Sequence, residues 1–213
     1  INAELVVLMD LRTGRYDVAL TGTIDRLIVK GLGVVDVQSR LRAVPGAGDG
    51  FTVTGRMAAA MVRVDNKTVR SLAGGLPRMQ ADVSLDANGR LSLRNLVLQA
   101  PKLRFTGSAQ RERSGAIRLV GSGRHTEFGP FRLTVTGTLD RPAVDVILDR
   151  PVAAAGIEVV HLRLTPDAGG YAFEASGQSM LGAFQTRGMI EMPRGGQTAI
   201  RIGEQRQRRL VFG

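Results

Sequence analysis

The segment Arg132–Leu148 reads RLTVTGTLDRPAVDVIL, in which two runs of alternating apolar and polar residues flank a central Asp–Arg–Pro. Tyr16–Leu32 reads YDVALTGTIDRLIVKGL and contains nearly the same phrase, TGTIDR, again followed by an apolar run. Alternation with a period of two is typical of β-strands that have one apolar and one polar face. The repeat therefore predicts a sheet built from similar units, each of them a strand, a turn and another strand.

The same alternation recurs along the rest of the chain. The clearest runs lie at 18–22, 51–55, 79–85, 90–95, 96–100, 102–108, 116–122, 132–138, 143–148, 159–164 and 171–176. With the less regular runs included, about a dozen strands are expected. Short connectors that begin with an acidic residue and end in Gly, at 86–89, 112–115 and 167–170, predict hairpin loops. Links this short leave no room for helical crossovers, so the sheet is expected to be an antiparallel meander.

One segment departs from the period of two. Residues 65–77 read DNKTVRSLAGGLP, in which Asp65 or Asn66 is a candidate N-cap. Apolar residues follow at helical spacing: Val69, Leu72, Ala73 and Leu76. Two glycines and Pro77 then end the pattern. The sequence predicts one short helix at about 66–74, packed at an end of the sheet.

Composition limits the classes of function. The chain of 213 residues is 43% apolar, as expected of a folded protein, and carries a formal net charge of +10. Aromatic residues make up only 4%, so the chain offers little for stacking nucleic-acid bases, and nucleic-acid binding is not predicted. The absence of cysteine excludes disulfides, thiolate metal sites and cysteine nucleophiles. No apolar run of about 20 residues predicts a membrane-spanning helix.

Neither a catalytic site nor a metal or cofactor site is predicted. Asp25 and Asp140 occupy equivalent places in the two phrases, but neither has an evident catalytic partner. We interpret both as turn residues that accept hydrogen bonds from the following backbone amides. His125 and His161 are the only histidines, and neither has a second ligand at metal-binding spacing. The serines that lie close to glycines are not in a G-x-S-x-G motif. The sequence thus predicts no enzyme.

The apolar faces of the strands have to be hidden from water. A second packed sheet, a closed barrel or a sheet curled around an apolar ligand would each achieve this. The faces consist of Val, Leu and Ile interrupted by small residues, with few of the large rings that fill the space between packed sheets. This composition favours an apolar groove, and a dry core between two sheets is the alternative.

The candidate groove-lining residues are apolar members of the clearest alternating runs. They are Val18, Leu20, Leu91, Leu93, Leu103, Phe105, Leu133, Val135, Val144, Val146 and Leu148.

Several motifs resemble a family of bacterial envelope proteins. The string TVTGTLDRPAVDVILDRP, preceded by FGPF at 128–131, resembles a signature of the TamB and AsmA-like proteins, a group that includes the YdbH-type proteins. Residues 77–123 resemble the recurrent strand, turn and strand pattern of the same group. The similarity is best over 65–150, and its strength lies in the order of the motifs.

The resemblance implies a bridge-like lipid transfer protein that functions in outer membrane biogenesis. Such proteins are anchored in the inner membrane by an N-terminal helix, and they extend through the periplasm as a sheet curled into an open half-pipe, or β-taco. They are implicated in passive phospholipid transport between the inner and outer membranes, with acyl chains in the apolar interior. Residues 1–213 would then be a single β-groove segment of a longer protein, whose anchor lies outside this segment.

Two other classes of function stay open. The first is a periplasmic scaffold that docks an outer-membrane protein partner, with a role in outer-membrane protein assembly, by pairing with an exposed edge strand. The second is an enzyme whose site the sequence does not reveal.

Overall fold

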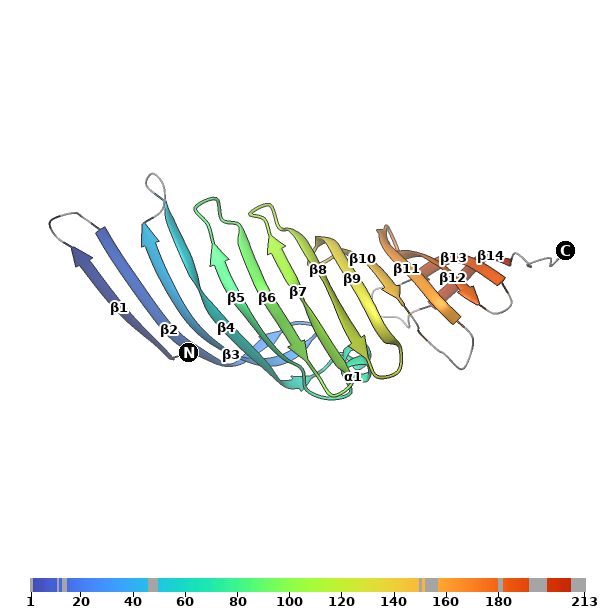
Figure 1. The fold of residues 1–213 in the computed structure, drawn as a ribbon, viewed down its shortest axis with the longest axis horizontal. Helices are drawn as coiled ribbons and strands as arrows, with labels where there is room; N and C mark the ends of the chain where they lie inside the picture. The colour runs from blue at the N-terminus through green and yellow to red at the C-terminus, as the bar shows by residue number, and fades with distance from the viewer. Residues whose placement is uncertain are drawn as a thin grey trace. The chain divides into compact units, whose positions relative to one another are not determined.

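The computed structural model describes residues 2–10, 12, 15–45, 50–149, 151, 157–179, 182–191 and 199–207. The described part of the protein is all-β with one short helix, and within each of its two units consecutive strands are antiparallel neighbours (Figure 1). The chain divides into two compact units, Ile1–Gly115 and Ala116–Gly213. The predicted antiparallel meander with one short helix is confirmed.

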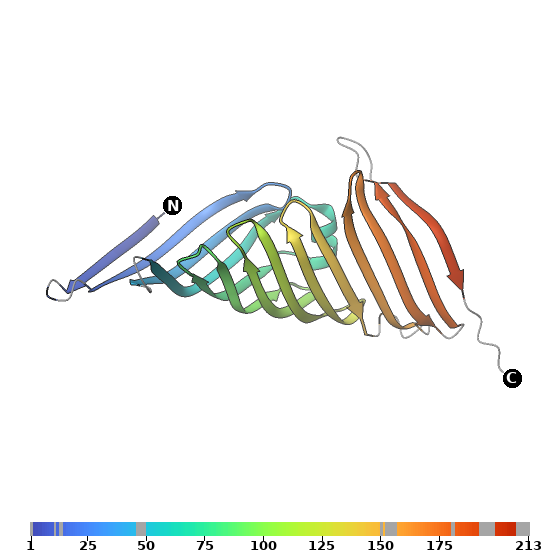
Figure 2. The same cartoon turned by 90° about the horizontal axis from the view of Figure 1, so that it is seen from above.

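The first unit contains seven strands and the helix. Their bounds are β1 Asn2–Asp10, β2 Arg15–Val29, β3 Gly33–Pro45, β4 Phe51–Val64, α1 Lys67–Ala73, β5 Arg78–Leu85, β6 Leu91–Gln99 and β7 Leu103–Arg111. Among the described residues, β1 pairs only with β2, so this sheet is open and does not close into a barrel. Figure 2 shows that the sheet is strongly twisted and curved.

The second unit contains the remaining seven strands. They are β8 Ala116–His125, β9 Gly129–Thr138, β10 Pro142–Leu148, β11 Ile157–Asp167, β12 Gly170–Ser179, β13 Gly182–Glu191 and β14 Ala199–Gln207. The hairpin predicted at 167–170 joins β11 to β12, with Asp167 opposite Gly170. The hairpin predicted at 86–89 joins β5 to β6 in the first unit, where the Gly89 amide donates to the Asp86 carbonyl at 3.0 Å. Both loops are confirmed.

The two copies of the repeated phrase fold differently. Asp140 lies in the tight connection between β9 and β10, where the Arg141 amide donates to the Thr138 carbonyl at 3.2 Å. Asp25 lies within the continuous strand β2, so the prediction of a turn at this position is wrong. The register shifts between Ile24 and Leu27, which makes Asp25 part of a β-bulge.

Two bulges of the first unit each contain a residue other than glycine that has a positive φ angle. Arg26 has φ 56° and its amide donates to Asp36 Oδ1 at 2.7 Å. Asn95 has φ 50° and its side-chain amide donates to Asp82 Oδ2 at 2.7 Å. Because the chain stays in the sheet through Asn95, the runs predicted at 90–95 and 96–100 form one strand, β6. In each bulge a carboxylate from the neighbouring strand holds the irregular residue.

The helix α1 begins and ends as its sequence predicts. The side chain of Asn66 is the N-cap and accepts from the Val69 amide at 3.1 Å, and Gly74 ends the helix in the left-handed conformation at φ 68°. The Asn66 side chain also donates to the Gly31 carbonyl at 3.2 Å, which ties the helix to the turn between β2 and β3. The amide of Lys102, just before β7, donates to the Ala73 carbonyl at 2.9 Å. The helix therefore lies at the ends of the strands of the first unit.

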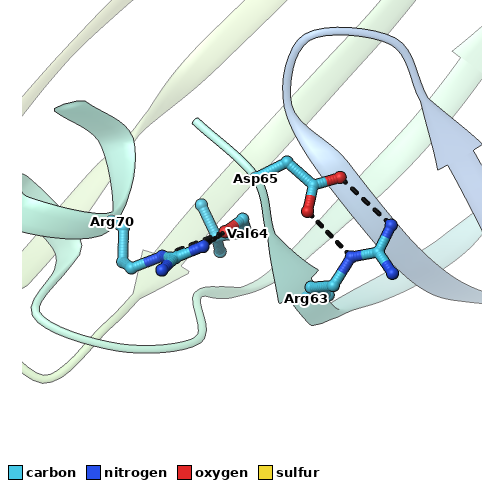
Figure 3. A network of polar contacts seen from close by, with 4 residues as sticks. All are labelled: Arg63, Val64, Asp65 and Arg70. Carbon is cyan, nitrogen blue, oxygen red and sulfur yellow. Dashed lines mark hydrogen bonds and ion pairs between the residues drawn. The ribbon is translucent and has the colours of Figure 1, made fainter. Parts of the chain in front are cut away.

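A small polar network surrounds the start of the helix (Figure 3). Arg63 makes a two-pronged ion pair with Asp65, at 2.8 and 3.2 Å. Arg70 of the helix reaches back and donates to the Val64 carbonyl, from Nε at 3.0 Å and from a second guanidinium nitrogen. Together these contacts fix the connection from β4 to α1.

The buried core is small. Within the described residues, the buried hydrophobic side chains are Val34, Val64, Ala73, Ala81, Leu96 and Phe105. All six belong to the first unit.

Candidate functional site

The strand registers of the second unit gather apolar side chains on one face. Side chains of directly opposed residues project to the same face of a sheet. Val135 of β9 lies opposite Val144 of β10, which in turn lies opposite Leu164 of β11. Extended to the neighbouring strands, this apolar row comprises Leu119, Val135, Val144, Leu164 and Phe173. A second row beside it comprises Leu133, Val146, Leu162 and Ala175.

A third row completes this face. Phe131 lies opposite Leu148, and Leu148 lies opposite Val160. Val160 is followed by Gly177 of β12 and Phe184 of β13. A Cβ atom on Gly177 would lie 2.6 Å from the ring of Phe184, so the ring occupies the space that the missing side chain leaves. We refer to the three rows together as the apolar face of the second unit.

The first unit has an equivalent apolar face. Leu20 of β2 lies opposite Leu5 of β1 and Leu41 of β3. Further along the sheet, Val83 lies opposite Leu93, and on the next pair Leu98 lies opposite Phe105. Other members of this face are Val7, Val18, Ala43, Val53, Leu85 and Leu91. This set is the apolar face of the first unit.

The structure places the eleven candidate lining residues on these two faces. Val18 and Leu20 on β2, Leu91 and Leu93 on β6, and Leu103 and Phe105 on β7 share the face of the first unit. Leu133, Val135, Val144, Val146 and Leu148 share the face of the second. Residues that were not singled out, such as Leu41, Val83 and Leu162, belong to the same faces. The sequence signal that could have identified these residues is their apolar position in the alternating runs.

Most of the candidate side chains on these faces stay partly exposed within the described residues. Close backbone contacts run between consecutive strands and between α1 and β4. Of the eleven candidates only Phe105 is buried, with 5% of its surface exposed, and the others are half-buried. Ten of the eleven candidate side chains therefore keep part of their surface in water.

Hollows of the first unit lie on its opposite, polar face. One has a volume of about 590 Å³ and is lined by side chains of β2 to β6, among them Arg40, Arg56 and Asp82. An adjoining one of about 400 Å³ shares Gln38, Ala58 and Gln80 with it. We call the first the polar hollow. The sequence did not predict it because it depends on which polar residues of five strands come into register.

Most ion pairs lie on the polar faces or at strand ends. Hydrogen bonds from Arg42, from Nε to each carboxylate oxygen at 2.8 Å, lower the pKa of the Asp17 carboxyl and raise the pKa of Arg42. A similar hydrogen bond from Arg90 to Glu112 raises the pKa of Arg90. All four side chains are partly in water, where such pairs stabilise a fold only slightly.

The histidines occupy ordinary structural positions. His161 Nε2 lies 2.9 Å from Asp145 Oδ1, and Arg163 donates to the other oxygen of Asp145 at 3.3 Å. His125 is buried, accepts from the Glu127 amide at 3.1 Å and stacks on Phe128 with 4.6 Å between ring centroids. Among the described residues, no three His, Asp or Glu side chains are grouped so that they could hold a metal ion. That part of the chain likewise has no helix with the length and apolarity needed to cross a membrane.

Comparison with known proteins adds no relative. The chain matches no protein-family model, and no curated protein or solved structure is significantly similar to it. The resemblance to the TamB and AsmA-like proteins therefore rests on the sequence motifs alone.

Proposed function

We propose that the two apolar faces bind the acyl chains of phospholipids. The observation that carries this proposal is the set of in-register apolar rows whose side chains stay partly exposed. An acyl chain gains about 0.8 kcal/mol for each methylene group that it removes from water, and it needs no directional bond. A face built repetitively from Val, Leu and Ile is sufficient for such a ligand.

The proposed role is a passive one. On this view, and in line with the family resemblance, the chain is a segment of a periplasmic conduit through which phospholipid moves between the inner and outer membranes. Acyl chains would lie on the apolar faces while head groups stay in water.

Photo-crosslinking tests the proposal on a single strand. A photoreactive residue at Leu133 or Val135 of β9 points to the apolar face, whereas the same residue at Thr134 or Thr136 points to the polar face. In cells, crosslinks to phospholipid are expected from the first pair and not from the second. Mass spectrometry of the purified protein should also detect co-purified phospholipid. Equal lipid crosslinking from both faces, or a lipid-free protein, would contradict the proposal.

Charge substitution provides a functional test. Val135→Glu or Val146→Glu places a carboxylate in the apolar rows and is expected to slow transfer of a fluorescent phospholipid between vesicles at least tenfold. Thr136→Glu, on the other face of the same strand, is the matched control and should transfer lipid at the normal rate. Unchanged transfer by Val135→Glu and Val146→Glu would refute the conduit.

A scaffold that docks an outer-membrane protein partner is the second candidate, and strand β1 favours it. Its exposed fractions are 61% for Leu5, 46% for Val6, 56% for Val7 and 66% for Leu8, so both faces of this strand are apolar and in water. Within the described residues β1 pairs on one side only, and a strand with a free edge can pair with a strand of another protein. Crosslinks from β1 to a protein, without lipid crosslinks from β9, would favour this function.

A further inference from the structure

The polar hollow of the first unit has an unusual distribution of charge. Arg40 of β3 and Arg56 of β4 are direct cross-strand partners, so their side chains project side by side from the same face. Like charges in this arrangement destabilise a sheet. Both arginines line the hollow of about 590 Å³, a volume typical of small-molecule sites.

The surrounding groups do not neutralise this pair. The charged side chains that line the hollow are Arg40, Arg56 and Asp82. Asp82 lies 3.4 Å from Arg56 Nε and also accepts from Asn95 at 2.7 Å. The side chain of Arg40 makes no hydrogen bond or ion pair with any described residue. Arg94 is the cross-strand partner of Asp82 and adds a further positive charge beside the hollow.

We propose that the polar hollow binds a phosphate ester that also carries hydroxyl groups. A phosphate group placed between Arg40 and Arg56 would accept charge-assisted hydrogen bonds from both guanidinium groups and remove their repulsion. The remaining lining groups are neutral donors and acceptors suited to hydroxyl groups: Thr21, Thr23, Gln38, Gln80 and Asn95. No aromatic side chain lines the hollow, so the site offers no stacking surface for a nucleobase.

This site is independent of the proposed lipid-binding faces. Arg40, Arg56 and Gln38 alternate along their strands with Leu41, Gly55 and Val37, which project to the apolar face. The sheet itself separates the two surfaces, so an acyl chain bound on one face does not occupy the hollow on the other. Loss of ligand at one surface should leave binding at the other intact.

Calorimetric titration tests the proposal with two soluble probes, inorganic phosphate and glycerol 3-phosphate, at low ionic strength. Saturable binding is expected, and it should be tighter for glycerol 3-phosphate because of its hydroxyl groups. R40Q and R56Q are each expected to weaken binding at least tenfold. R118Q, which removes an exposed arginine from the polar face of β8 in the second unit, is the matched control and should bind normally.

Melting temperatures, measured with and without ligand, distinguish a loss of binding from a loss of folding. Removing Arg40 relieves a like-charge contact and breaks no ion pair with a described residue, so R40Q should fold and melt no earlier than the wild type. Glycerol 3-phosphate should raise the melting temperature of the wild type and of R118Q, but not that of R40Q. Absence of saturable binding, or equal weakening by R40Q and R118Q, would overturn the proposal.

Vesicles that contain phosphatidylglycerol separate the two sources of such an ester. If R40Q weakens vesicle binding relative to R118Q, the phosphate belongs to a lipid head group. If only binding of glycerol 3-phosphate responds to R40Q, the ligand is a soluble ester. Vesicle binding that does not respond to R40Q, together with no binding of either soluble probe, would exclude the site.

Discussion

The segments Thr21–Leu27 and Thr136–Pro142 read TGTIDRL and TGTLDRP, yet one is a bulged strand and the other a hairpin. In both, the regular ladder is interrupted at the Asp–Arg pair. In the first, the Arg26 amide finds an acceptor across the sheet, on Asp36. In the second, the Arg141 amide finds one within its own turn, on the Thr138 carbonyl. The shared motif thus specifies an interruption of the strand pairing. Whether this interruption is a bulge or a hairpin depends on which group accepts the hydrogen bond from the arginine amide.

The residue that follows the phrase should have the largest effect. Leu27→Pro is expected to lower the free energy of unfolding by about 3 kcal/mol, since proline is incompatible with most strand interiors and also disfavours the left-handed conformation that Arg26 adopts before it. The reverse change, Pro142→Leu, should cost less than about 1 kcal/mol because leucine fits an extended strand and loses only the rigidity of proline. Urea denaturation measures both. Similar losses for the two changes would mean that the following residue does not distinguish bulge from hairpin.

The shared glycine should have the next largest effect. Gly137 has φ 96°, and a Cβ atom there would lie 2.9 Å from the Arg141 carbonyl oxygen. Gly137→Ala should therefore cost about 2 kcal/mol of unfolding free energy. The equivalent Gly22 has ordinary backbone angles, and its nearest neighbour would be 3.4 Å away. Gly22→Ala, measured in the same denaturation series, should change stability by no more than about 0.5 kcal/mol, and an equal cost at both sites would contradict the structural difference.

The acceptor at the bulge should have a smaller effect. Asp36→Ala removes the partner of the Arg26 amide and is expected to cost about 1 kcal/mol. Hydrogen exchange at the Arg26 amide should accelerate in this variant. Asp36→Asn keeps an oxygen acceptor and should restore most of the protection. An Arg26 amide that exchanges at the same rate in all three proteins would show that Asp36 does not hold the bulge.

The ion pair beside the first phrase should have the smallest effect. Hydrogen bonds from Arg42 lower the pKa of Asp17, so the folded protein binds this proton less readily than the unfolded chain. The pair therefore adds stability above the unfolded pKa of Asp17, and this contribution disappears as the pH falls through the lowered, folded pKa. An NMR titration should show a higher pKa for Asp17 in Arg42→Gln than in the wild type. The difference in stability between the two proteins should vanish in acid.

Local patterns made most of the fold predictable. Alternation identifies strands, Asp and Gly identify hairpins, and the Asn66 cap with Gly74 identifies the helix, because each of these signals acts within a few residues. The bulge at Asp25 was mistaken for a turn because its decisive partner, Asp36, lies on another strand. The polar hollow could not be predicted for the same reason, because Arg40 and Arg56 become neighbours only through the pairing of β3 with β4.

The candidate site was predictable to a similar degree. Alternation gave the side of the sheet on which Val135 and Val144 lie, because that side follows from their place in the strand. It did not give the degree of exposure of these side chains, which depends on what lies over that side of the sheet. Residues such as Leu162, in a run that was recognised as a strand, were omitted because no local signal ranks one apolar position above another.

Within each unit, every strand pairs with the strands next to it in the chain. Stability in such an arrangement is a sum of couplings between neighbours, as in solenoid proteins, and folding can start at any hairpin and spread in both directions. A hairpin can then be gained or lost without repacking distant residues. Evolution can therefore lengthen or shorten such a sheet one hairpin at a time.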